Sequence, residues 1–228
     1  MKKLNYTIIS LLTLFISCNP DDYYYKDLIK EKDIVYPGKI DSLTFRGGEN
    51  RFLLTTILPK DSKVNKLILY WNNNNLIDSI ILKINEENAG KKHEFLVENV
   101  NENVYNFDIY STNLKGYKSV RSQTSGRVYG KVYKSSLVNR AITSSTVNTN
   151  GDASLVFITE TSTYFKCTKV TYIDNNNITK TIKFGKEINT LSLPNYKKGT
   201  DIIYEAGYLP MITALDTIYS TPNKLILN

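Results

Sequence analysis

Short apolar segments separated by Asn, Gly and Pro dominate the chain beyond its N-terminal region. Seven of them lie between Asp41 and Gly126: DSLTFRG, RFLLTTILP, KLILYW, DSIILKI, HEFLVENV, VYNFDIYST and KSVRSQTSG. Each is about five to eight residues long, which is the usual length of a β-strand. No long segment has the period of an amphipathic helix, and regularly spaced short strands are typical of β-sandwiches. The sequence therefore predicts an all-β protein.

The pattern repeats at an interval of about 102 residues. LILYWNNNNLIDSIILKIN begins at Leu67 and KVTYIDNNNITKTIKFGKE at Lys169, which pairs Tyr70 with Tyr172. In each copy a strand leads into an Asn-rich segment, such as Asn72–Asn75. We predict that this segment is a turn, because Asn tolerates left-handed backbone and its side chain hydrogen-bonds within its own turn. Downstream, FLVENVNENVYNFDIYS matches LSLPNYKKGTDIIYEAG in the same order. We therefore expect two tandem immunoglobulin-like or fibronectin-like sandwiches.

The first sandwich is expected over residues 37–124, and a linker followed by the second sandwich over residues 125–228. The linker segment, Ser125–Ile142, carries Gly and Ser. FLVENVNENVYNFDIYSTN is similar to the fibronectin type III pattern of a strand, a tight bend and a strand that begins near a tyrosine. By this resemblance Tyr105 occupies the tyrosine-corner position.

The N-terminus has the organisation of a secretory signal. A basic MKK start precedes an apolar run over Ile8–Ile16, and the small residue Ser17 stands immediately before Cys18. A spanning helix needs about 20 apolar residues, so this run is too short to cross a membrane. Residues 1–17 are therefore predicted to be a signal peptide.

A signal whose apolar region stops on a cysteine resembles a bacterial lipoprotein signal. The resemblance implies cleavage between Ser17 and Cys18 and acylation of Cys18. The lipid would attach the protein to the membrane, and multiple acyl chains would make this anchor stable. Residues 18–36 then form a tether, and Asp21 and Asp22 resemble the tag that exports Bacteroidota lipoproteins to the outer face of the outer membrane. The alternative is a plain signal peptide with an incidental cysteine.

Charge and cysteine content exclude few functions. Loss of Lys2 and Lys3 with the signal would reduce the formal net charge from +7 to +5. The remaining basic residues are spread among acids, so nothing favours nucleic acid as a partner.

Cys167 would have no disulfide partner if Cys18 is acylated, so we expect no disulfide. We expect Cys167 to be a small buried side chain.

Catalytic and metal motifs are absent from the sequence. The single histidine, His93, is predicted to be a solvated turn residue, which leaves no base for a Ser-His or Cys-His pair. His and Cys are too few for a metal cage, and there is no Walker or dinucleotide motif, so no metal and no cofactor is expected. DNNN from Asp174 resembles a calcium loop weakly and is better explained as a turn.

Two strand carboxylates provide the one catalytic alternative. Asp108 in YNFDIYS and Asp201 in GTDIIYE are predicted to stand at matching places in the two copies. Glycoside hydrolysis needs two acids that face each other across a cleft. Since both copies carry the acid, we interpret the two residues as structural positions on an outer sheet face.

The only tryptophan, Trp71, permits two registers. If Leu67 and Leu69 face inward, Trp71 is the buried tryptophan of an immunoglobulin-like core. If Ile68 and Tyr70 face inward instead, Trp71 points outward and becomes a candidate aromatic for ligand contact.

Three tripeptides resemble the O-glycosylation sequon of Bacteroidota secreted proteins. They are DSL, DSI and DTI, which would place a glycan on Ser42, Ser79 or Thr217. Such tripeptides also arise by chance. Our hypothesis is that at least one of the three is modified.

Four segments in order, DDYYYKDLIKEKDIVYPGKIDSL, YWNNN, GRVYGKVYKSSLVNR and YLPMITALDTIY, resemble the Bacteroidota lipoproteins grouped as domain of unknown function 4998. The resemblance implies a secreted, sandwich-built protein associated with surface carbohydrate handling, without assigned catalytic residues. We therefore expect a non-catalytic binding or spacer component of an outer-membrane glycan system, with polysaccharide, other surface lipoproteins or a transporter as partners. An adhesin that binds proteins is the alternative.

Overall fold

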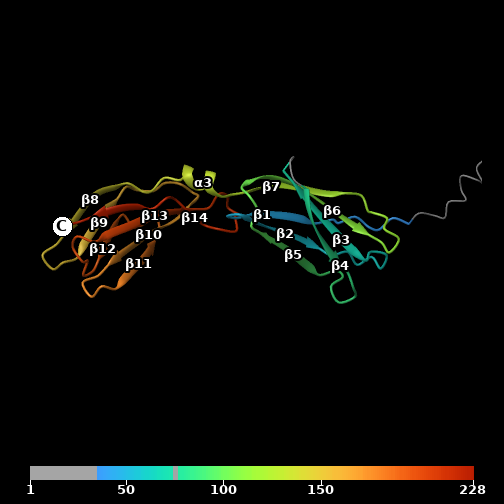
Figure 1. Ribbon diagram of the computed structural model, residues 1–228, viewed down its shortest axis with the longest axis horizontal. Helices are drawn as coiled ribbons and strands as arrows, with labels where there is room; N and C mark the ends of the chain where they lie inside the picture. Colours follow the sequence, from blue (N-terminus) through green and yellow to red (C-terminus); the bar gives the residue numbers. More distant parts are fainter. Residues whose placement is uncertain (1–34, 74–76) are drawn as a thin grey trace, which may run out of the picture. The chain divides into compact units, whose positions relative to one another are not determined.

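The first sandwich consists of seven strands among the residues that the computed structural model describes, 35–73 and 77–228 (Figure 1). They are β1 (Leu43–Gly47), β2 (Arg51–Ile57), β3 (Lys66–Asn72), β4 (Ile77–Lys83), β5 (Lys92–Glu98), β6 (Asn103–Thr112) and β7 (Ser122–Val128). One sheet has the order β1-β2-β5 and the other the order β4-β3-β6-β7, with antiparallel pairing throughout. Each of the seven apolar segments thus forms a strand.

The second sandwich repeats this topology. Its strands are β8 (Ile142–Val147), β9 (Ala153–Phe157), β10 (Phe165–Ile173), β11 (Thr179–Phe184), β12 (Thr190–Leu193), β13 (Asp201–Tyr208), β14 (Ile218–Tyr219) and β15 (Asn223–Ile226). The sheets have the orders β12-β9-β8 and β11-β10-β13-β14, and β15 also pairs with β13. The chain is therefore all-β, with tandem sandwiches like those of fibronectin type III proteins, as predicted.

The two cores follow from the period-two alternation of the strands. In β2, Phe52 and Leu54 point inward and are fully buried, while their neighbours are half-buried. In the first core the Phe52 ring meets Trp71 and Phe107 edge-on, with centroids 5.6 and 4.8 Å away. The second core is a separate cluster around residues such as Leu155 and Ile202. Each sandwich therefore buries its own apolar interior.

The boundary between the sandwiches lies further along the chain than predicted. Strand β7 continues to Val128, because Ser125–Val128 pair with Asn103–Asn106 of β6. The prediction that the first sandwich ends at residue 124 is therefore wrong. The connection contains the short helix α3 (Lys131–Ser136), whose first N–H groups donate to the carboxylate of Glu102.

The predicted alignment of Tyr70 with Tyr172 is shifted by one residue. Trp71 opposes Phe107 of β6 and is 7% exposed, so it faces the first core, while Tyr70 points outward. In the second sandwich Tyr172 faces the core and is 3% exposed. Trp71 is thus the structural counterpart of Tyr172, because a shift of one residue exchanges the two faces of a strand.

The tyrosine corner is confirmed in the first sandwich. The hydroxyl of Tyr105 donates to the carbonyl of Asn101 at 2.9 Å. In the second sandwich the ring comes from the preceding loop instead, where buried Tyr196 donates to the carbonyl of Thr200. The same bend is therefore closed by tyrosines at different positions.

The predicted signal peptide, the lipidated Cys18 with its cleavage partner Ser17, and the tether up to residue 34 lie outside the described residues. Within the described ranges, no helix has the length and apolar character needed to cross a membrane.

Candidate functional site

The outer face of the β4-β3-β6-β7 sheet carries a concentration of polar and aromatic side chains. Alternation along the strands turns every second residue outward, and the cross-strand register aligns these residues in rows. Two adjacent rows across β3, β6 and β7 are Tyr70, Asp108 and Gln123, then Asn72, Asn106 and Ser125. Strands that are distant in sequence therefore bring several amides and one carboxylate together.

These rows enclose an open pocket of about 340 Å³. Its lining residues are Asn72, Asn106, Asp108, Arg121, Gln123, Thr124 and Ser125. Within the described part of the chain, the side-chain amides of Asn72, Asn106 and Gln123 form no hydrogen bond with another protein group. Each amide offers both donors and an acceptor, so the pocket can recognise a ligand rich in hydroxyl groups.

Asp108 and Arg121 supply the charges of the pocket. The carboxylate of Asp108 lies 3.6 Å from a terminal nitrogen of Arg121, and the two side chains are 23% and 52% exposed. One long contact leaves most of the guanidinium donors free, because arginine carries five N–H groups in a planar fork. Arg121 is therefore available to an incoming group.

Two tyrosines lie beside the pocket. The rings of Tyr70 and Tyr110 meet edge-on with centroids 6.1 Å apart. The ammonium of Lys118 lies 5.3 and 5.2 Å from the two centroids and donates to the Tyr70 hydroxyl at 3.5 Å. Cation–π attraction holds the lysine at this place while its charge remains accessible to solvent.

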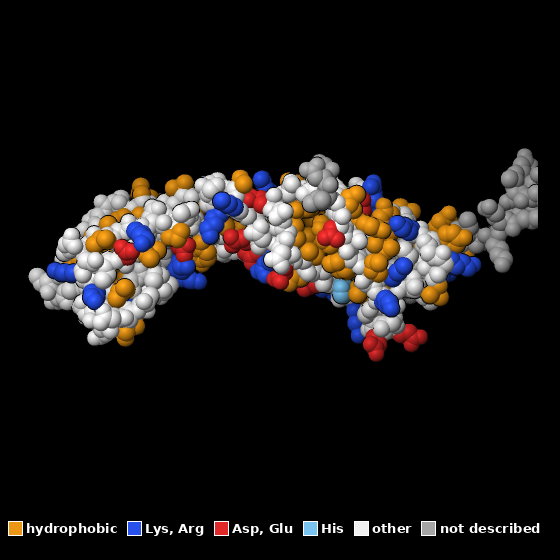
Figure 2. Space-filling view, viewed as in Figure 1, with side chains coloured by type: hydrophobic (Ala, Val, Ile, Leu, Met, Phe, Trp, Pro, Cys, Tyr) orange, Lys and Arg blue, Asp and Glu red, His pale blue; other side chains and the backbone are white. Residues whose placement is uncertain are grey.

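Exposed aliphatic residues continue the same face onto the edge strand β4. Ile77, which opposes Asn72, is 77% exposed, and Ile81, which opposes Ile68, is 60% exposed. Figure 2 shows hydrophobic side chains gathered on the surface of the first sandwich. The polar pocket therefore has an apolar margin.

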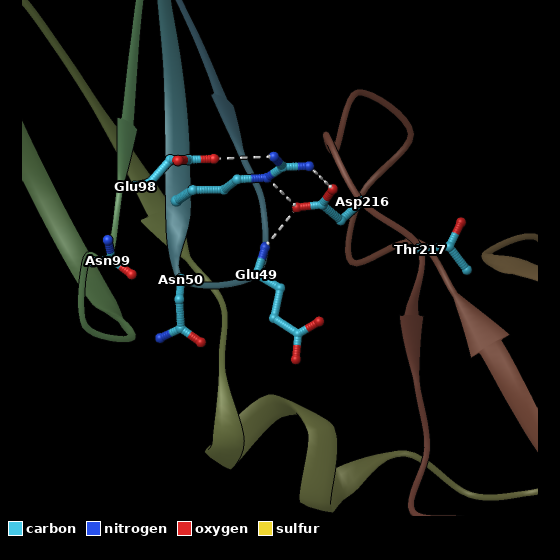
Figure 3. A pocket seen from close by; sticks show the side chains of 7 residues that line it. Glu49, Asn50, Glu98, Asn99, Asp216 and Thr217 are labelled. Atoms are coloured by element: carbon cyan, nitrogen blue, oxygen red, sulfur yellow. Dashed lines mark hydrogen bonds and ion pairs between the residues drawn. The ribbon is translucent and has the colours of Figure 1, made fainter.

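A second polar pocket, of about 430 Å³, is lined by residues of β2, β5 and the loop before β14 (Figure 3). Arg51 donates to both oxygens of Asp216 and lies 3.6 Å from Glu98, while the backbone N–H of Glu49 also donates to Asp216. The Arg51 hydrogen bond is the largest cause of a lowered pKa at Asp216. These charges satisfy one another, which favours a structural role.

The two candidate carboxylates, Asp108 and Asp201, do not form one site. Asp108 lies in the middle of β6 and pairs with Arg121, whereas Asp201 is the first residue of β13 and pairs with Lys224 at 2.7 Å. The interpretation as outer-face positions is confirmed, since both side chains are partly exposed. The prediction that they occupy matching places is wrong, because they stand at different points of their strands.

His93 differs from its prediction. It is a half-buried residue of β5 opposite Thr56, with its ring 4.7 Å from that of Phe95 in an edge-on contact. Loss of solvent around the ring lowers the pKa of His93. The prediction of a solvated turn residue is therefore wrong, because the strand begins before the histidine.

The Asp174 turn is confirmed. One carboxylate oxygen of Asp174 accepts the N–H groups of Asn176 and Ile178, both at 2.9 Å. This local bonding explains the DNNN segment without a metal. Among the described residues no group of His, Cys, Asp and Glu is arranged to hold a metal ion.

Cys167 is a free, half-buried thiol of β10, with its sulfur 3.6 Å from the Tyr219 hydroxyl.

Trp71 is 7% exposed and lines a small pocket together with residues such as Asn73 and Asp78. The core interpretation of Trp71 is thus confirmed.

The three sequon residues differ in accessibility. Ser79 is exposed on β4. Ser42 is half-buried, and its hydroxyl accepts the N–H of Ile57 at 3.0 Å. Thr217 is also half-buried, and it follows Asp216, whose carboxylate is already bound by Arg51. Ser79 is therefore the most accessible of the three.

The sequence did not single out most of the residues that line the pocket on the β4-β3-β6-β7 sheet. The missed lining residues are Asn72, Asn106, Arg121, Gln123, Thr124 and Ser125, and Tyr70, Tyr110 and Lys118 beside the pocket were also missed. The alternation of polar and apolar residues in VYNFDIYST places Asn106 and Asp108 on one face. It does not identify their neighbours, because cross-strand partners are set by pairing between distant segments.

These features define a tandem fibronectin type III-like protein with an open polar pocket on the outer sheet face of its first sandwich. The chain belongs to the family described as a domain of unknown function, number 4998, whose profile matches residues 18–218.

Similar solved structures have low identity. The FN1–FN3 domains of chicken CNTN1 are 14% identical with a TM-score of 0.40, covering 85% of this chain and 68% of that chain. A segment of two fibronectin type III domains from chicken tenascin is 13% identical with a TM-score of 0.37, covering 83% and 99%. The chicken interferon gamma receptor alpha chain is 12% identical with a TM-score of 0.36, covering 83% and 98%. A comparison with curated proteins found no match.

Proposed function

We propose that this protein is a non-catalytic, glycan-binding accessory lipoprotein of the outer-membrane surface in Bacteroidota. The lipoprotein-like signal that ends at Cys18 supports the anchor, and the acids at Asp21 and Asp22 support export to the cell exterior. Multiple acylation would hold the protein stably on the membrane. The tandem sandwiches would then present a binding face to glycans of a nutrient-acquisition system.

One observation carries the binding part of the proposal. Three amides that have no hydrogen-bond partner among the described residues, from Asn72, Asn106 and Gln123, converge with Asp108 in a pocket beside Tyr70. Sugars present many hydroxyl groups to hydrogen-bonding side chains and apolar C–H faces to aromatic rings, so this combination suits a carbohydrate.

A glycan array probed with the full-length protein in detergent tests the proposal. We expect binding to at least one glycan class, and we expect the double variant Asn106→Ala with Gln123→Ala to lose most of it. Asn176→Ala, which changes an amide in a turn of the second sandwich, is the matched control. Failure of the wild-type protein to bind any glycan contradicts the proposal.

The anchor has its own test. Radiolabelled palmitate should enter the wild-type protein and not the Cys18→Ala variant. Recovery of the wild-type protein in the soluble periplasmic fraction would contradict lipidation.

A protein-binding adhesin is the second candidate function, and the exposed aliphatic margin at Ile77 and Ile81 favours it. Exposed apolar patches commonly mark protein contacts. Cell binding by the purified protein that is lost in Ile81→Lys, while glycan binding persists, would support this candidate.

Ser79 is the proposed site of O-glycosylation, because it is exposed on the edge strand β4. Intact-mass analysis of native protein should show a glycan that disappears in Ser79→Ala and persists in Thr217→Val. A mass that corresponds to lipid alone would contradict this modification.

A further inference from the structure

The four-stranded sheet of the first sandwich and the five-stranded sheet of the second differ in the charged residues of their outer faces. In the second sandwich, Lys169 of β10 forms an ion pair with Glu205 of β13. The ammonium groups of Lys169 and Lys183 also lie 5.0 and 5.7 Å from the ring centroid of Tyr219. On this face two lysines therefore have acid partners, because Lys224 of β15 also pairs with Asp201 at 2.7 Å.

The corresponding face of the first sandwich has an excess of cations. Among the described residues, its outward-facing strand positions carry one acid, Asp108, against Lys66, Lys83 and Arg127. Lys66 and Lys83 pair at the end of β3 opposite to Asn72, whereas Arg121 lines the pocket and Lys118 lies above the tyrosines beside it. The cations at and beside the pocket therefore favour an anion.

Arg121 has the geometry to receive that anion. Its side chain is 52% exposed, and its contact with Asp108 is 3.6 Å long, so most of its N–H groups remain free. The planar fork of a guanidinium binds a carboxylate through two parallel hydrogen bonds. Asp108 orients the guanidinium and balances one charge. Lys118 is a second cation, which has no ion-pair partner in the part of the chain that the structure describes.

We propose that the pocket binds an acidic glycan, in which a sugar carboxylate contacts Arg121 and sugar hydroxyls contact Asn72, Asn106 and Gln123. This inference rests on the proposed glycan-binding function and specifies its ligand class. Lys118 contributes long-range attraction to the acidic chain. Tyr70 provides the apolar contact for a sugar ring, and the second sandwich does not take part.

Calorimetric titration of the full-length protein in detergent tests the inference. The probes are oligosaccharides of galacturonic or glucuronic acid and the same oligosaccharides after reduction of their carboxyl groups to alcohols. We expect the acidic form to bind at least about tenfold more tightly than the reduced form, because a charge-assisted hydrogen bond is lost. Added salt should weaken binding of the acidic form only.

Substitution at the pocket gives the second arm of the test. Arg121→Gln should reduce affinity for the acidic form by about tenfold or more and leave affinity for the reduced form unchanged. Arg121→Lys should have an intermediate effect, because the charge stays and the fork is lost. Lys183→Gln, which removes a cation beside a tyrosine in the second sandwich, should leave both affinities unchanged.

The outcomes separate this inference from the proposed function. Equal affinity of the wild-type protein for both forms, or binding only to neutral glycans, overturns the acidic ligand and leaves glycan binding in place. Absence of binding to any glycan overturns both. An acidic glycan whose affinity is unaffected by Arg121→Gln, in a variant with wild-type thermal stability, overturns the assigned pocket.

Discussion

The two sandwiches have the same strand order but use their side chains differently. The first has an aromatic core in which Trp71 contacts Phe52, and its four-stranded sheet presents unpaired amides and cations to solvent. In the second, the five-stranded sheet pairs Lys169 with Glu205 across neighbouring strands. The repeated topology therefore does not imply a repeated site, because outward-facing residues can vary without disturbing the core.

Among the described residues, the buried polar groups of the second sandwich include charged side chains, whereas those of the first are serines and threonines. Arg140 is 2% exposed, and its guanidinium donates to the carbonyls of Ile158 and Ile188 and to the side-chain oxygen of Asn189. It lies within 5.3–5.8 Å of the ring centroids of Phe157, Phe165 and Phe184. Burial lowers the pKa of Arg140, so this contact is maintained by hydrogen bonds and ring contacts that offset desolvation.

The largest expected effect concerns the core of the first sandwich. Trp71→Ala should reduce the free energy of unfolding by about 3–5 kcal/mol, because it removes a buried ring from the contact with Phe52 and leaves a cavity. Tyr70→Ala, one residue earlier on the outer face, should cost less than about 1 kcal/mol. Denaturant titration of the full-length variants measures both. Equal losses would contradict the register of β3.

Arg140→Ala should have the next largest effect, in the second sandwich. The substitution leaves the carbonyls of Ile158 and Ile188 without this donor and removes packing against three rings, with an expected cost of about 2–4 kcal/mol. Thermal unfolding measures the loss, and Lys183→Ala on the outer face is the matched cation control. A stability unchanged from wild type would show that the buried guanidinium is dispensable.

The two tyrosine corners should differ in strength. Tyr196→Phe removes a hydroxyl that donates to Thr200 and accepts the N–H of Leu227, so it should cost about 2 kcal/mol. Tyr105→Phe removes the bond to Asn101 and should cost about 1 kcal/mol. Chemical denaturation of each variant gives the comparison. A larger loss at Tyr105 would reverse the order inferred from the hydrogen bonds.

The smallest effect is expected at the Asp216 contact with β2. The pKa of Asp216 is lowered in the folded state. The contribution of Asp216 to the free energy of unfolding is therefore fully present above the unfolded pKa of about 3.9, and it is lost as pH falls through the lowered folded pKa. Since Arg51 is more than one-third exposed, solvent screening limits the contribution to about 1 kcal/mol or less. Asp216→Asn should remove this pH dependence.

Unfolding experiments between pH 2 and about 7 test the Asp216 effect, with Asp201→Asn as a control for an exposed carboxylate that pairs with Lys224. The wild-type protein and Asp216→Asn should converge in stability at the acid end. A stability difference between the two proteins that grows as pH falls would contradict the lowered pKa of Asp216 in the folded state.

The predicted fold agrees with the structure because its signals are local. Each apolar segment and the Asp174 turn are specified within a few residues, and the Tyr105 hydroxyl reaches a carbonyl only four residues upstream. The errors occur where a boundary or a register depends on a distant partner. Strand β7 extends to Val128 because β6 pairs with it, and Trp71 faces the core because β3 aligns with β6 in that register.

The sequence by itself determined an all-β chain of two similar sandwiches, since strand length, alternation and turn residues are properties of neighbouring amino acids. Only the tertiary structure decided that Asn72, Asn106 and Gln123 share one pocket with Arg121. Their convergence requires three strands to pair in a particular register, and that register is fixed by the burial of apolar side chains on the opposite face of the sheet.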